Sequence, residues 1–384
     1  MVGPDGGGGR DSEADADPDL VDELLAGRHR ALARVITEIE NRSPGYRELV
    51  SSLHAHTGGA DVIGITGSPG AGKSTLVDKL AKAYRDAGLT VGVIAVDPSS
   101  PYSGGAVLGD RIRMASNVGD MDVFFRSMSA RGQLGGLSTA TSDAVKALDA
   151  FGKDKIIVET VGAGQNEVDV VRTADTVTVL VQPGSGDDVQ MLKAGILEIG
   201  DVFVVNKADM EGTPRTVAEL EEMIHLRENP GAMLDSGHHG SDAVGGFDSV
   251  PGDGAGHGGS EADDGASEAD GRETEAEEWE PVVVETVATT GDGVEELVET
   301  LDSHAAFLDR TGARAELERT RYAEEIRQLL RSDANAIVEE ELRRRGGAAA
   351  FAERVADRET DPYAVAEDVL RPIRECVEAR RDDS

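Results

Sequence analysis

Cysteine is nearly absent from this 384-residue chain, in which Cys376 is the single example. An intrachain disulfide and a cysteine-based metal site are therefore excluded. Aromatic residues make up only 3% of the chain, and lysine is so rare that arginine carries most of the positive charge. The chain also lacks any apolar run near the roughly 18 residues of a membrane span, and its N-terminus lacks the apolar stretch of a secretory signal. We therefore expect a soluble, cytoplasmic protein.

Positive charge is scarce as well, because 38 basic residues face 74 acidic ones, for a formal net charge of −36. The acidic residues are spread along the whole chain, including its helical stretches. Such a surface stays hydrated in concentrated salt, where charge repulsion is screened. The composition therefore predicts a halophilic source, such as a halophilic archaeon, and argues against nucleic acid or an anionic membrane as partner.

Composition and periodicity divide the chain into regions. Residues 1–17 form an acidic, glycine-rich tail that we expect to be disordered, and residues 18–57 predict a small helical N-terminal extension. Across 58–305, short β-branched runs alternate with helical stretches, which predicts parallel strands joined by crossover helices. At about 229–280 this region is interrupted by a segment rich in Gly, Asp, Glu and Ser, which we interpret as a disordered acidic insertion. Residues 306–384 are predicted to be helical.

The stretch GSPGAGKS, residues 67–74, follows the apolar run DVIGIT and precedes a helical pattern. It fits the pattern G-x-x-x-x-G-K-[ST], in which glycines let successive backbone N–H groups point at an anion. Lys73 can reach the outer phosphates, and the Ser74 hydroxyl can ligate Mg²⁺. The following helix directs its positive dipole end at the same charge. The predicted phosphate-binding residues are Gly67, Ser68, Pro69, Gly70, Ala71, Gly72, Lys73, Ser74 and Thr75.

This context predicts the fold class as α/β: a P-loop NTPase with a mostly parallel sheet flanked by helices, plus helical N- and C-terminal extensions.

A second motif, NKAD at residues 206–209, directly follows the apolar run VFVV. The carboxylate of its last residue can accept two hydrogen bonds, from the N1–H and N2–H₂ groups of guanine, whereas adenine has no such donor pair. A site built on that pair rejects the analogue that lacks it. The motif therefore predicts GTP and GDP, rather than ATP, as ligands. The candidate guanine-contacting residues are Asn206, Lys207 and Asp209, with Thr286, Val287 and Ala288 from the later stretch ETVATTGDG.

Carboxylates stand at two further strand ends beside the phosphate loop. Glu159 begins the segment ETVGAGQNE after the run KIIV, and Asp97 ends the run VGVIAVD. Each can hold Mg²⁺ directly or through water, and together with Lys73 they are candidate catalytic residues. GTPases usually have Asp where Glu159 stands. The predicted Mg²⁺ ligands are Ser74, Asp97, Asp110 and Glu159.

The chain behind each carboxylate is a candidate nucleotide-sensing segment. Gly162 frees a backbone N–H to meet the γ-phosphate, and Gln165 is a candidate catalytic residue for positioning the attacking water. Behind Asp97, a loop rich in Pro, Ser and Gly can close over the nucleotide. Asp110 in that loop is either a further metal ligand or an N-capping acid at the surface.

A further charged stretch, QPGSGDDVQMLKAGILEIGD, begins at another strand end with Gln182. Its spacing alone indicates a solvated loop followed by a helix start. Its charged residues Asp187 and Lys193 leave a second interpretation open, in which the loop reports the nucleotide state to a partner.

Together, these segments resemble the methylmalonyl-CoA mutase-associated GTPases (the MeaB/ArgK type). The matching blocks include GSPGAGKSTL, VDPSSPYSGGAVLGDRIRM, ETVGAGQNEVDV and ETVATTGDGVEEL, and the resemblance covers most of residues 18–345 apart from the insertion. It implies a homodimeric GTPase of the signal-recognition-particle-like class. Such a protein acts as chaperone of adenosylcobalamin-dependent methylmalonyl-CoA mutase, gating cofactor loading and protecting or reactivating the enzyme. The implied switch regions are 97–111, 159–167 and 183–194, and we expect the C-terminal helices to form the dimer contact.

The chain departs from the family pattern at Asn166, where Ser is usual, at Ala194, where Lys is usual, and in the acidic insertion. Two alternative functions remain. A nucleotide-dependent metallochaperone would need a Cys or His cluster near the phosphate loop, and a kinase linked to amino-acid (LAO/AO) transport would need an acceptor pocket and a catalytic base. We do not expect cobalamin to bind the chain itself. Asp302 and His304 begin a D-x-H-x-x-G motif, but Phe307 replaces its glycine.

Overall fold

The computed structural model describes residues 18–97, 115–117, 119–129, 136–160, 173–184, 197–228 and 277–382. Within this part of the chain, seven strands form one sheet. The strands are β1 (Asp61–Gly67), β2 (Val91–Asp97), β3 (Val123–Ser129), β4 (Lys155–Thr160), β5 (Thr176–Val181), β6 (Val202–Asn206) and β7 (Val282–Thr286). The helices are α1 (Pro18–Leu25), α2 (His29–Asn41), α3 (Tyr46–His54), α4 (Lys73–Asp86), α6 (Gly136–Ala150), α9 (Thr213–Glu228), α11 (Val294–Thr311), α12 (Ala313–Arg344), α13 (Gly347–Ala356) and α14 (Pro362–Asp382), with a 3-10 turn at Ala115–Asn117.

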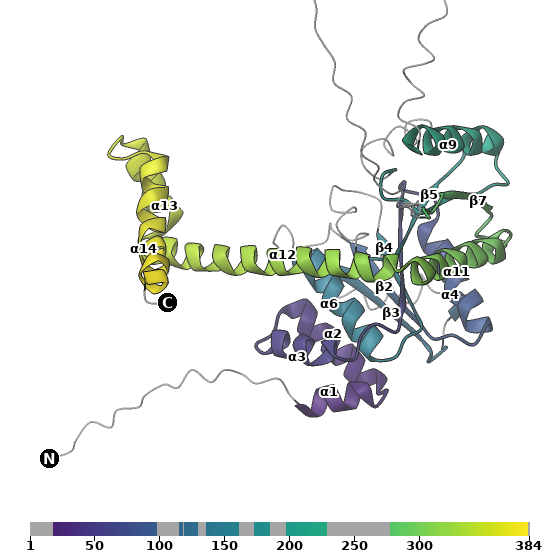
Figure 1. Ribbon diagram of the computed structural model, residues 1–384, viewed down its shortest axis with the longest axis horizontal. Coiled ribbons are helices and arrows are strands. Elements are labelled where there is room, and N and C mark those ends of the chain that lie inside the picture. Colours follow the sequence, from purple (N-terminus) through teal and green to yellow (C-terminus); the bar gives the residue numbers. More distant parts are fainter. Residues whose placement is uncertain are drawn as a thin grey trace, which may run out of the picture.

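The strand order across the sheet is β3-β2-β4-β1-β5-β6-β7, and every neighbouring pair is parallel. Helices flank the sheet on both sides (Figure 1). The predicted α/β fold class is thereby confirmed. Because the strands are parallel, all their carboxyl ends lie at one edge, and β1, which leads into the phosphate loop, is the central strand. None of the helices described is long and apolar enough to cross a membrane.

Successive residues of each strand pack on opposite faces of the sheet. In β4, Ile156 and Val158 belong to the cluster that contains α6 and the N-terminal helices, whereas Ile157 packs with α4 and α11. In β6, Phe203 packs with α9 and Val204 packs with α4 and α11. Both faces are therefore covered, which is why the strands read as continuous apolar runs rather than alternating ones.

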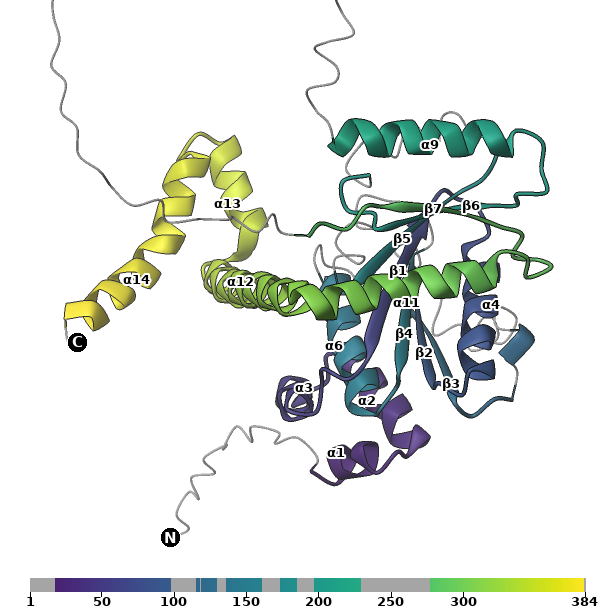
Figure 2. The same cartoon turned by 45° about the vertical axis from the view of Figure 1, so that its right-hand side comes forward.

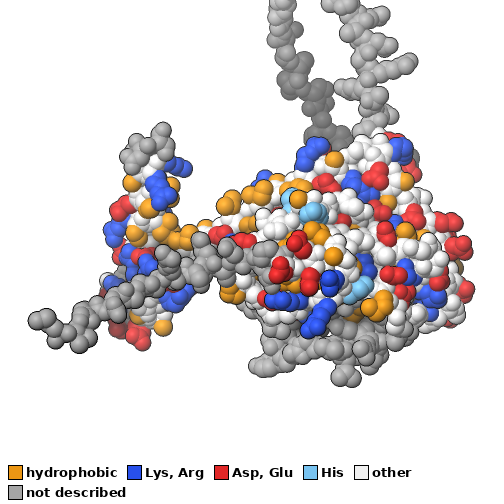
Figure 3. All heavy atoms as spheres, turned by 90° about the horizontal axis from the view of Figure 1, so that it is seen from below, with side chains coloured by type: hydrophobic (Ala, Val, Ile, Leu, Met, Phe, Trp, Pro, Cys, Tyr) orange, Lys and Arg blue, Asp and Glu red, His pale blue; other side chains and the backbone are white. Residues whose placement is uncertain are grey.

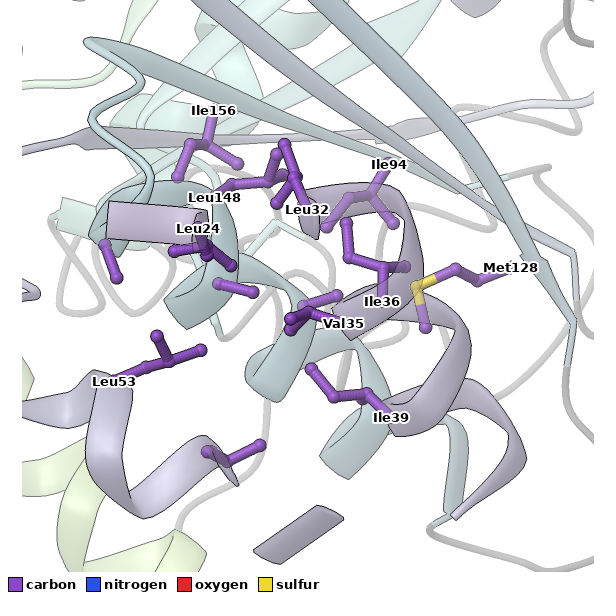
Figure 4. Packing of buried hydrophobic residues seen from close by; sticks show 14 of the residues in the cluster. Leu24, Leu32, Val35, Ile36, Ile39, Leu53, Ile94, Met128, Leu148 and Ile156 are labelled. Carbon is purple, nitrogen blue, oxygen red and sulfur yellow. The ribbon is translucent and has the colours of Figure 1, made fainter. Parts of the chain in front are cut away.

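The N-terminal helices α1–α3 bury their apolar faces against α6 and the sheet. Five residues on one face of α2 are buried, and they interdigitate with residues from α6 and from strands β2 to β4. Burial of each of the four larger side chains, Leu32, Val35, Ile36 and Ile39, contributes about 1.5–3 kcal/mol. The N-terminal extension therefore shares the main core of the molecule. Figure 4 labels members of this cluster: Leu24, Leu32, Val35, Ile36, Ile39, Leu53, Ile94, Met128, Leu148 and Ile156.

Ion pairs tie α11 and α12 to the edge where the strands begin. Arg314 of α12 donates hydrogen bonds to Asp61 of β1 (2.8 Å) and to Asp175, which precedes β5 (3.0 Å). Lys155 of β4 donates to Asp61 (2.8 Å) and to Asp302 of α11 (2.8 Å). Arg314 and Lys155 are mostly shielded from water, so each depends on its carboxylate partners to offset the hydration it loses.

Beyond this anchor, α12 leaves the globular part of the molecule and carries α13 and α14 at its far end (Figures 1 and 2). None of its 32 residues is buried. A helix of this length extends about 48 Å at 1.5 Å per residue. Lys146 of α6 pairs with Glu325, and Arg47 of α3 pairs with Asp333 (2.7 Å), so the middle of α12 still contacts the globular part. Its large exposed apolar residues are Leu317, Tyr322, Ile326, Leu330 and Ile337.

Both ends of the predicted insertion are attached to the short segment that precedes β6. Arg227, near the end of α9, donates hydrogen bonds to the carbonyl oxygens of Leu197 (2.7 Å) and Gly200 (3.3 Å). On the other side of the insertion, the Trp279 indole N–H donates to the carbonyl oxygen of Asp201 (3.0 Å). Because β6 begins here, both attachments lie at the edge opposite the phosphate loop. The residues between 228 and 277 lie outside the described part of the chain.

Trp279 also packs on α11. Its ring meets the imidazole of His304 edge to face, with centroids 4.7 Å apart, and lies 5.5 Å from the Phe307 ring. His304 is buried and hydrogen-bonds Thr176 through Nδ1 (2.7 Å). Burial lowers the pKa of His304 to about 4, so its ring is neutral at neutral pH. Asp302 and His304, which begin the incomplete cobalamin motif, therefore take part in ion pairing and packing at the edge of the sheet where the strands begin.

Candidate functional site

The phosphate loop joins the end of β1 to the start of α4 and depends on two glycines. Gly67 has a φ of 131° and Gly72 a φ of 95°, both in the region that favours glycine. A Cβ on Gly67 would lie 2.0 Å from the Leu180 carbonyl oxygen, and one on Gly72 would lie 2.4 Å from Asn206 Nδ2. The loop therefore packs directly against the ends of β5 and β6, with no room for side chains between them.

Lys73 lies at the start of α4, and its side chain turns back over the loop. Its Nζ donates hydrogen bonds to the carbonyl oxygens of Gly67 (2.7 Å) and Ser68 (3.0 Å), and the residue is only 5% exposed. The ammonium is thus held inside the curve of the phosphate loop, against the loop's own carbonyl oxygens. A phosphate seated there would meet this charge, the loop N–H groups and the positive end of α4 together.

Ser74 and Glu159 bring a hydroxyl and a carboxylate together at the same helix start. The Ser74 hydroxyl donates to Glu159 Oε1, and Glu159 is buried near the end of β4. Oxygen donors of this kind suit Mg²⁺, which is commonly held by one or two carboxylates together with substrate phosphates. The backbone of Asp97 ends β2, the strand next to β4, while its side chain lies outside the described atoms. Two of the four predicted metal ligands therefore meet.

Asn206, at the end of β6, connects the phosphate loop to the loop after β7. Its Nδ2 donates to the carbonyl oxygen of Ala71 (2.7 Å). Its Oδ1 accepts from the Thr286 hydroxyl (3.1 Å) and from the Ala288 N–H (3.0 Å). Asn206 is 2% exposed, and these three bonds use both acceptor sites and one N–H of its buried amide. The three predicted segments are thereby brought together by one side chain.

Lys207 and Asp209 complete the NKAD loop. Lys207 has a left-handed φ of 61°, and its Nζ donates to the carbonyl oxygen of Gly70 (2.7 Å) and to Gln182 Oε1 (2.8 Å). The lysine stem therefore spans from the NKAD loop to the phosphate loop. Asp209 is exposed, so its carboxylate is accessible to a ligand. In the loop after β7, Thr286 and Ala288 are buried and Val287 is half-buried beside them.

Several predicted site residues lie outside the described part of the chain. They are Asp110, Gly162 and Gln165, together with Asp187 and Lys193. Of the implied switch regions 97–111, 159–167 and 183–194, only the first one or two residues are described. The roles assigned to these residues remain predictions.

Sequence reasoning treated Gln182 only as the start of a charged segment and missed its contact with Lys207. The available signal was its position, since a polar residue directly after an apolar strand beside the phosphate loop faces the edge where ligands bind in such sheets. No motif marks it, because its partner lies 25 residues away on a neighbouring strand end.

A family model described as "Methylmalonyl Co-A mutase-associated GTPase MeaB" matches residues 32–342. A protein of Pyrococcus abyssi described as a GTPase is 43% identical over 355 residues, covering 92% of this chain and 96% of that protein. GTPase ArgK of Escherichia coli is 40% identical over 190 residues, covering 48% of this chain and 57% of ArgK.

Two further matches come from a larger protein and from a solved structure. A fused isobutyryl-CoA mutase of Cupriavidus metallidurans is 40% identical over 200 residues, which cover 51% of this chain and 18% of the mutase protein. The crystal structure of an LAO/AO transport system kinase has a TM-score of 0.57 at 22% identity, covering 93% of this chain and 97% of that one. At that identity the structural match shows a shared fold.

Proposed function

The chain belongs to the methylmalonyl-CoA mutase-associated GTPase family, and from that premise we propose that it is a Mg²⁺-dependent GTPase that acts as chaperone of an adenosylcobalamin-dependent mutase. The proposed partner is methylmalonyl-CoA mutase, for which the protein gates cofactor loading and protects or reactivates the enzyme. The family match over residues 32–342 carries this proposal.

The geometry supports guanine nucleotide as the ligand. Asn206 holds the phosphate loop against the loop after β7, an arrangement that suits a ligand with phosphates at one end and a base at the other. In this proposal the exposed Asp209 accepts from guanine N1–H and N2–H₂, and the buried Lys73 meets the phosphates. A bound Mg²⁺ would neutralise charge on the β- and γ-phosphates, and Ser74 and Glu159 are the described residues that would hold it.

The positions of the predicted switch regions support a partner that senses the nucleotide. These regions begin at the ends of β2, β4 and β5, which with β1 are consecutive in the sheet. Their first, described residues therefore lie on both sides of the phosphate loop. A partner that docks on this edge and prefers the GTP state must tighten GTP binding by the same factor, because coupling between two binding sites is reciprocal.

A mutase is the partner class that the relatives favour. In the fused isobutyryl-CoA mutase, a stretch similar to about half of this chain forms part of a protein that is named as a mutase. Physical linkage of two activities in one relative supports contact between separate proteins in another. We further propose a homodimer formed through the C-terminal helices, since α12 exposes Ile326, Leu330 and Ile337. This helix starts against Asp61, at the edge of the sheet opposite the phosphate loop.

The test is GTP turnover in multimolar salt with and without purified methylmalonyl-CoA mutase from the same cells. We expect the mutase to form a nucleotide-dependent complex and to raise the turnover rate. Lys193→Ala should abolish this stimulation while GTP affinity is retained, and Lys82→Ala, on the surface of α4, is the matched control. If sedimentation shows no complex and the rate is unchanged, the chaperone proposal fails and the transport-kinase and metal-delivery alternatives return.

A further inference from the structure

The side chain of Gln182 stands at a junction between three segments of the site. It follows the last residue of β5, which lies between β1 and β6 in the sheet. Its Oε1 accepts a hydrogen bond from Lys207 Nζ (2.8 Å), and the same ammonium donates to the Gly70 carbonyl oxygen (2.7 Å). One lysine head group is thus shared between the phosphate loop and the chain that leaves β5.

The backbone fixes the position of Gln182 relative to the phosphate loop. Two residues earlier, the carbonyl oxygen of Leu180 accepts a hydrogen bond from the Ser68 N–H (3.1 Å). The absence of a Cβ at Gly67 lets these two segments approach, since that atom would lie 2.0 Å from the same oxygen. The backbone therefore holds Gln182 beside the phosphate loop, within reach of the Lys207 ammonium.

Lys207 needs such partners because its backbone is unfavourable. Its φ of 61° lies in the left-handed region, which residues with a Cβ rarely adopt. This conformation sends the side chain back over the phosphate loop instead of into solvent. The two acceptors compensate for it and keep the stem stretched between the NKAD loop, which carries Asp209, and the phosphate loop. In the proposed function, a nucleotide that spans those two loops would pass along this stem.

We propose that Gln182 is a positioning residue for guanine nucleotide, which acts by holding Lys207 between the NKAD loop and the phosphate loop. The inference rests on the proposed guanine-nucleotide function. Removing the acceptor frees the ammonium from one side, so the stem loses its fixed place and the nucleotide loses a preformed surface. Lys207 belongs to the NKAD loop, which is the proposed base-binding loop, and it contacts the backbone of the phosphate loop. The γ-phosphate is not needed for this contact, so we expect GDP and GTP binding to be affected alike.

The experiment is a double-mutant cycle on GDP affinity, measured by calorimetry with the full chain in multimolar salt and Mg²⁺. Gln182→Leu removes the acceptor at similar size, and we expect GDP affinity to fall about tenfold, the scale of a hydrogen bond to a charged group. In a Lys207→Met background the same substitution should change affinity by less than about twofold, since its target is gone. Gln182→Glu keeps an acceptor for the ammonium and should retain affinity within about threefold of wild type.

The outcomes distinguish failure of the proposed role of Gln182 from failure of the proposed guanine-nucleotide function. If wild-type protein binds no GDP, the proposed function itself fails. If wild-type protein binds GDP and Gln182→Leu binds it equally well, only the role of Gln182 is overturned. Equal loss of affinity in the wild-type and Lys207→Met backgrounds would also overturn it, because Gln182 would then act through the loop as a whole. Should Gln182→Leu fail to fold by circular dichroism, loss of affinity in a folded Gln182→Glu variant decides against the proposal.

Discussion

At the scale of single residues, the site depends on a contact that one missing side chain makes possible. Gly72 leaves the space that the Asn206 amide occupies, and that amide joins three loops. The arrangement of the loops in the site therefore depends on contacts between residues that are distant in sequence. Substitutions at Gly72, in the phosphate loop, and at Asp209, in the NKAD loop, test the contributions of these two loops.

Gly72→Ala should damage the site more than Gly70→Ala. Both positions have a positive φ, so an alanine at either costs about 1–2 kcal/mol of backbone strain. Only at Gly72 does the new Cβ meet Asn206, and the displaced buried amide should cost about 1–3 kcal/mol more. Chemical unfolding and GDP titration measure both effects. Equal losses in the two variants would show that the contact with Asn206 is unimportant.

Asp209→Asn should weaken guanine-nucleotide binding about tenfold or more, because a charged acceptor of two hydrogen bonds is replaced by a neutral amide. Titrations of GDP, GTP and ATP with Mg²⁺ in multimolar salt provide the measurement. Glu211→Gln, an exposed acid two residues further on, is the matched control and should bind like wild type. Comparable affinities of the wild-type protein for ATP and GTP would contradict the assignment of guanine specificity.

At the scale of elements, the helix α12 stands out because it presents apolar residues to solvent along one side. Tyr322, Ile326, Leu330 and Ile337 recur at spacings that place them on one face of a helix. Figure 3 shows hydrophobic side chains along the stretch that joins the globular part to the far helices. Tyr322 also meets the His54 ring of α3 edge to face, with centroids 5.3 Å apart, whereas Ile326, Leu330 and Ile337 are each more than half exposed. An exposed apolar stripe of this kind favours a second copy of the chain as the element that covers it.

Leu330→Glu should therefore shift the protein from dimer to monomer. The side chain is 64% exposed in the single chain, so the substitution should leave the folded monomer intact while it places a charge in the proposed contact. Sedimentation equilibrium measures the change in mass. Ser332→Glu adds the same charge on the opposite side of the helix and should remain dimeric. A monomeric wild-type protein, or a dimer that tolerates Leu330→Glu, would refute this contact.

Local signals explain which elements the sequence alone could predict. Lys73 and Ser74 are recognisable because phosphate binding demands fixed spacing within one loop, and helix α2 is recognisable from its apolar period. The face that α2 covers, with Ile94 and Met128, depends on the order of the strands, which has no local signature. The same holds for the contact of Gln182 with Lys207, since it exists only because β5 lies between β1 and β6.

At the scale of the whole molecule, we predict that the insertion can be removed without loss of the fold. Arg227 and Trp279 attach its two ends to the segment before β6, at the edge opposite the phosphate loop. Deleting residues 231–275 should therefore leave GTP binding intact, since loop closure changes by only about 0.6 kcal/mol per doubling of length. Nucleotide titration and thermal unfolding of the deletion variant in high salt measure this.

The matched control for the deletion is the same variant with Trp279→Ala. It removes an anchor rather than the insertion, and we expect a lower unfolding temperature because the indole ring packs on His304 and Phe307. If the simple deletion already loses guanine affinity, the interpretation of this segment as an insertion independent of the site is wrong.

Acid should destabilise the molecule partly through His304. Its pKa is about 4 in the folded protein and near 6.5 when unfolded, so between these values the unfolded chain binds more protons and stability falls as the pH drops. At pH 5 the loss is about 2 kcal/mol relative to neutral pH. Burial raises the pKa of the nearby Asp201 to about 6, which acts in the opposite direction.

Comparison with His304→Gln isolates the contribution of the histidine. The free energy of unfolding in urea should show wild type losing its advantage over the variant by about 2 kcal/mol between pH 7 and pH 5. A constant difference across this range would mean that His304 is protonated to the same extent in both states.

Trp279 gives the molecule a built-in optical probe. It is the single tryptophan of the chain, so all indole emission comes from one ring, packed between the segment before β6 and α11. Emission from a ring in such surroundings shifts to longer wavelength when the ring is released into water. The probe lies at the edge of the sheet away from the nucleotide, so a change in emission on adding GDP would report movement transmitted through the sheet instead of contact with the ligand. Spectroscopy without any label can thus follow how the two edges of the sheet communicate.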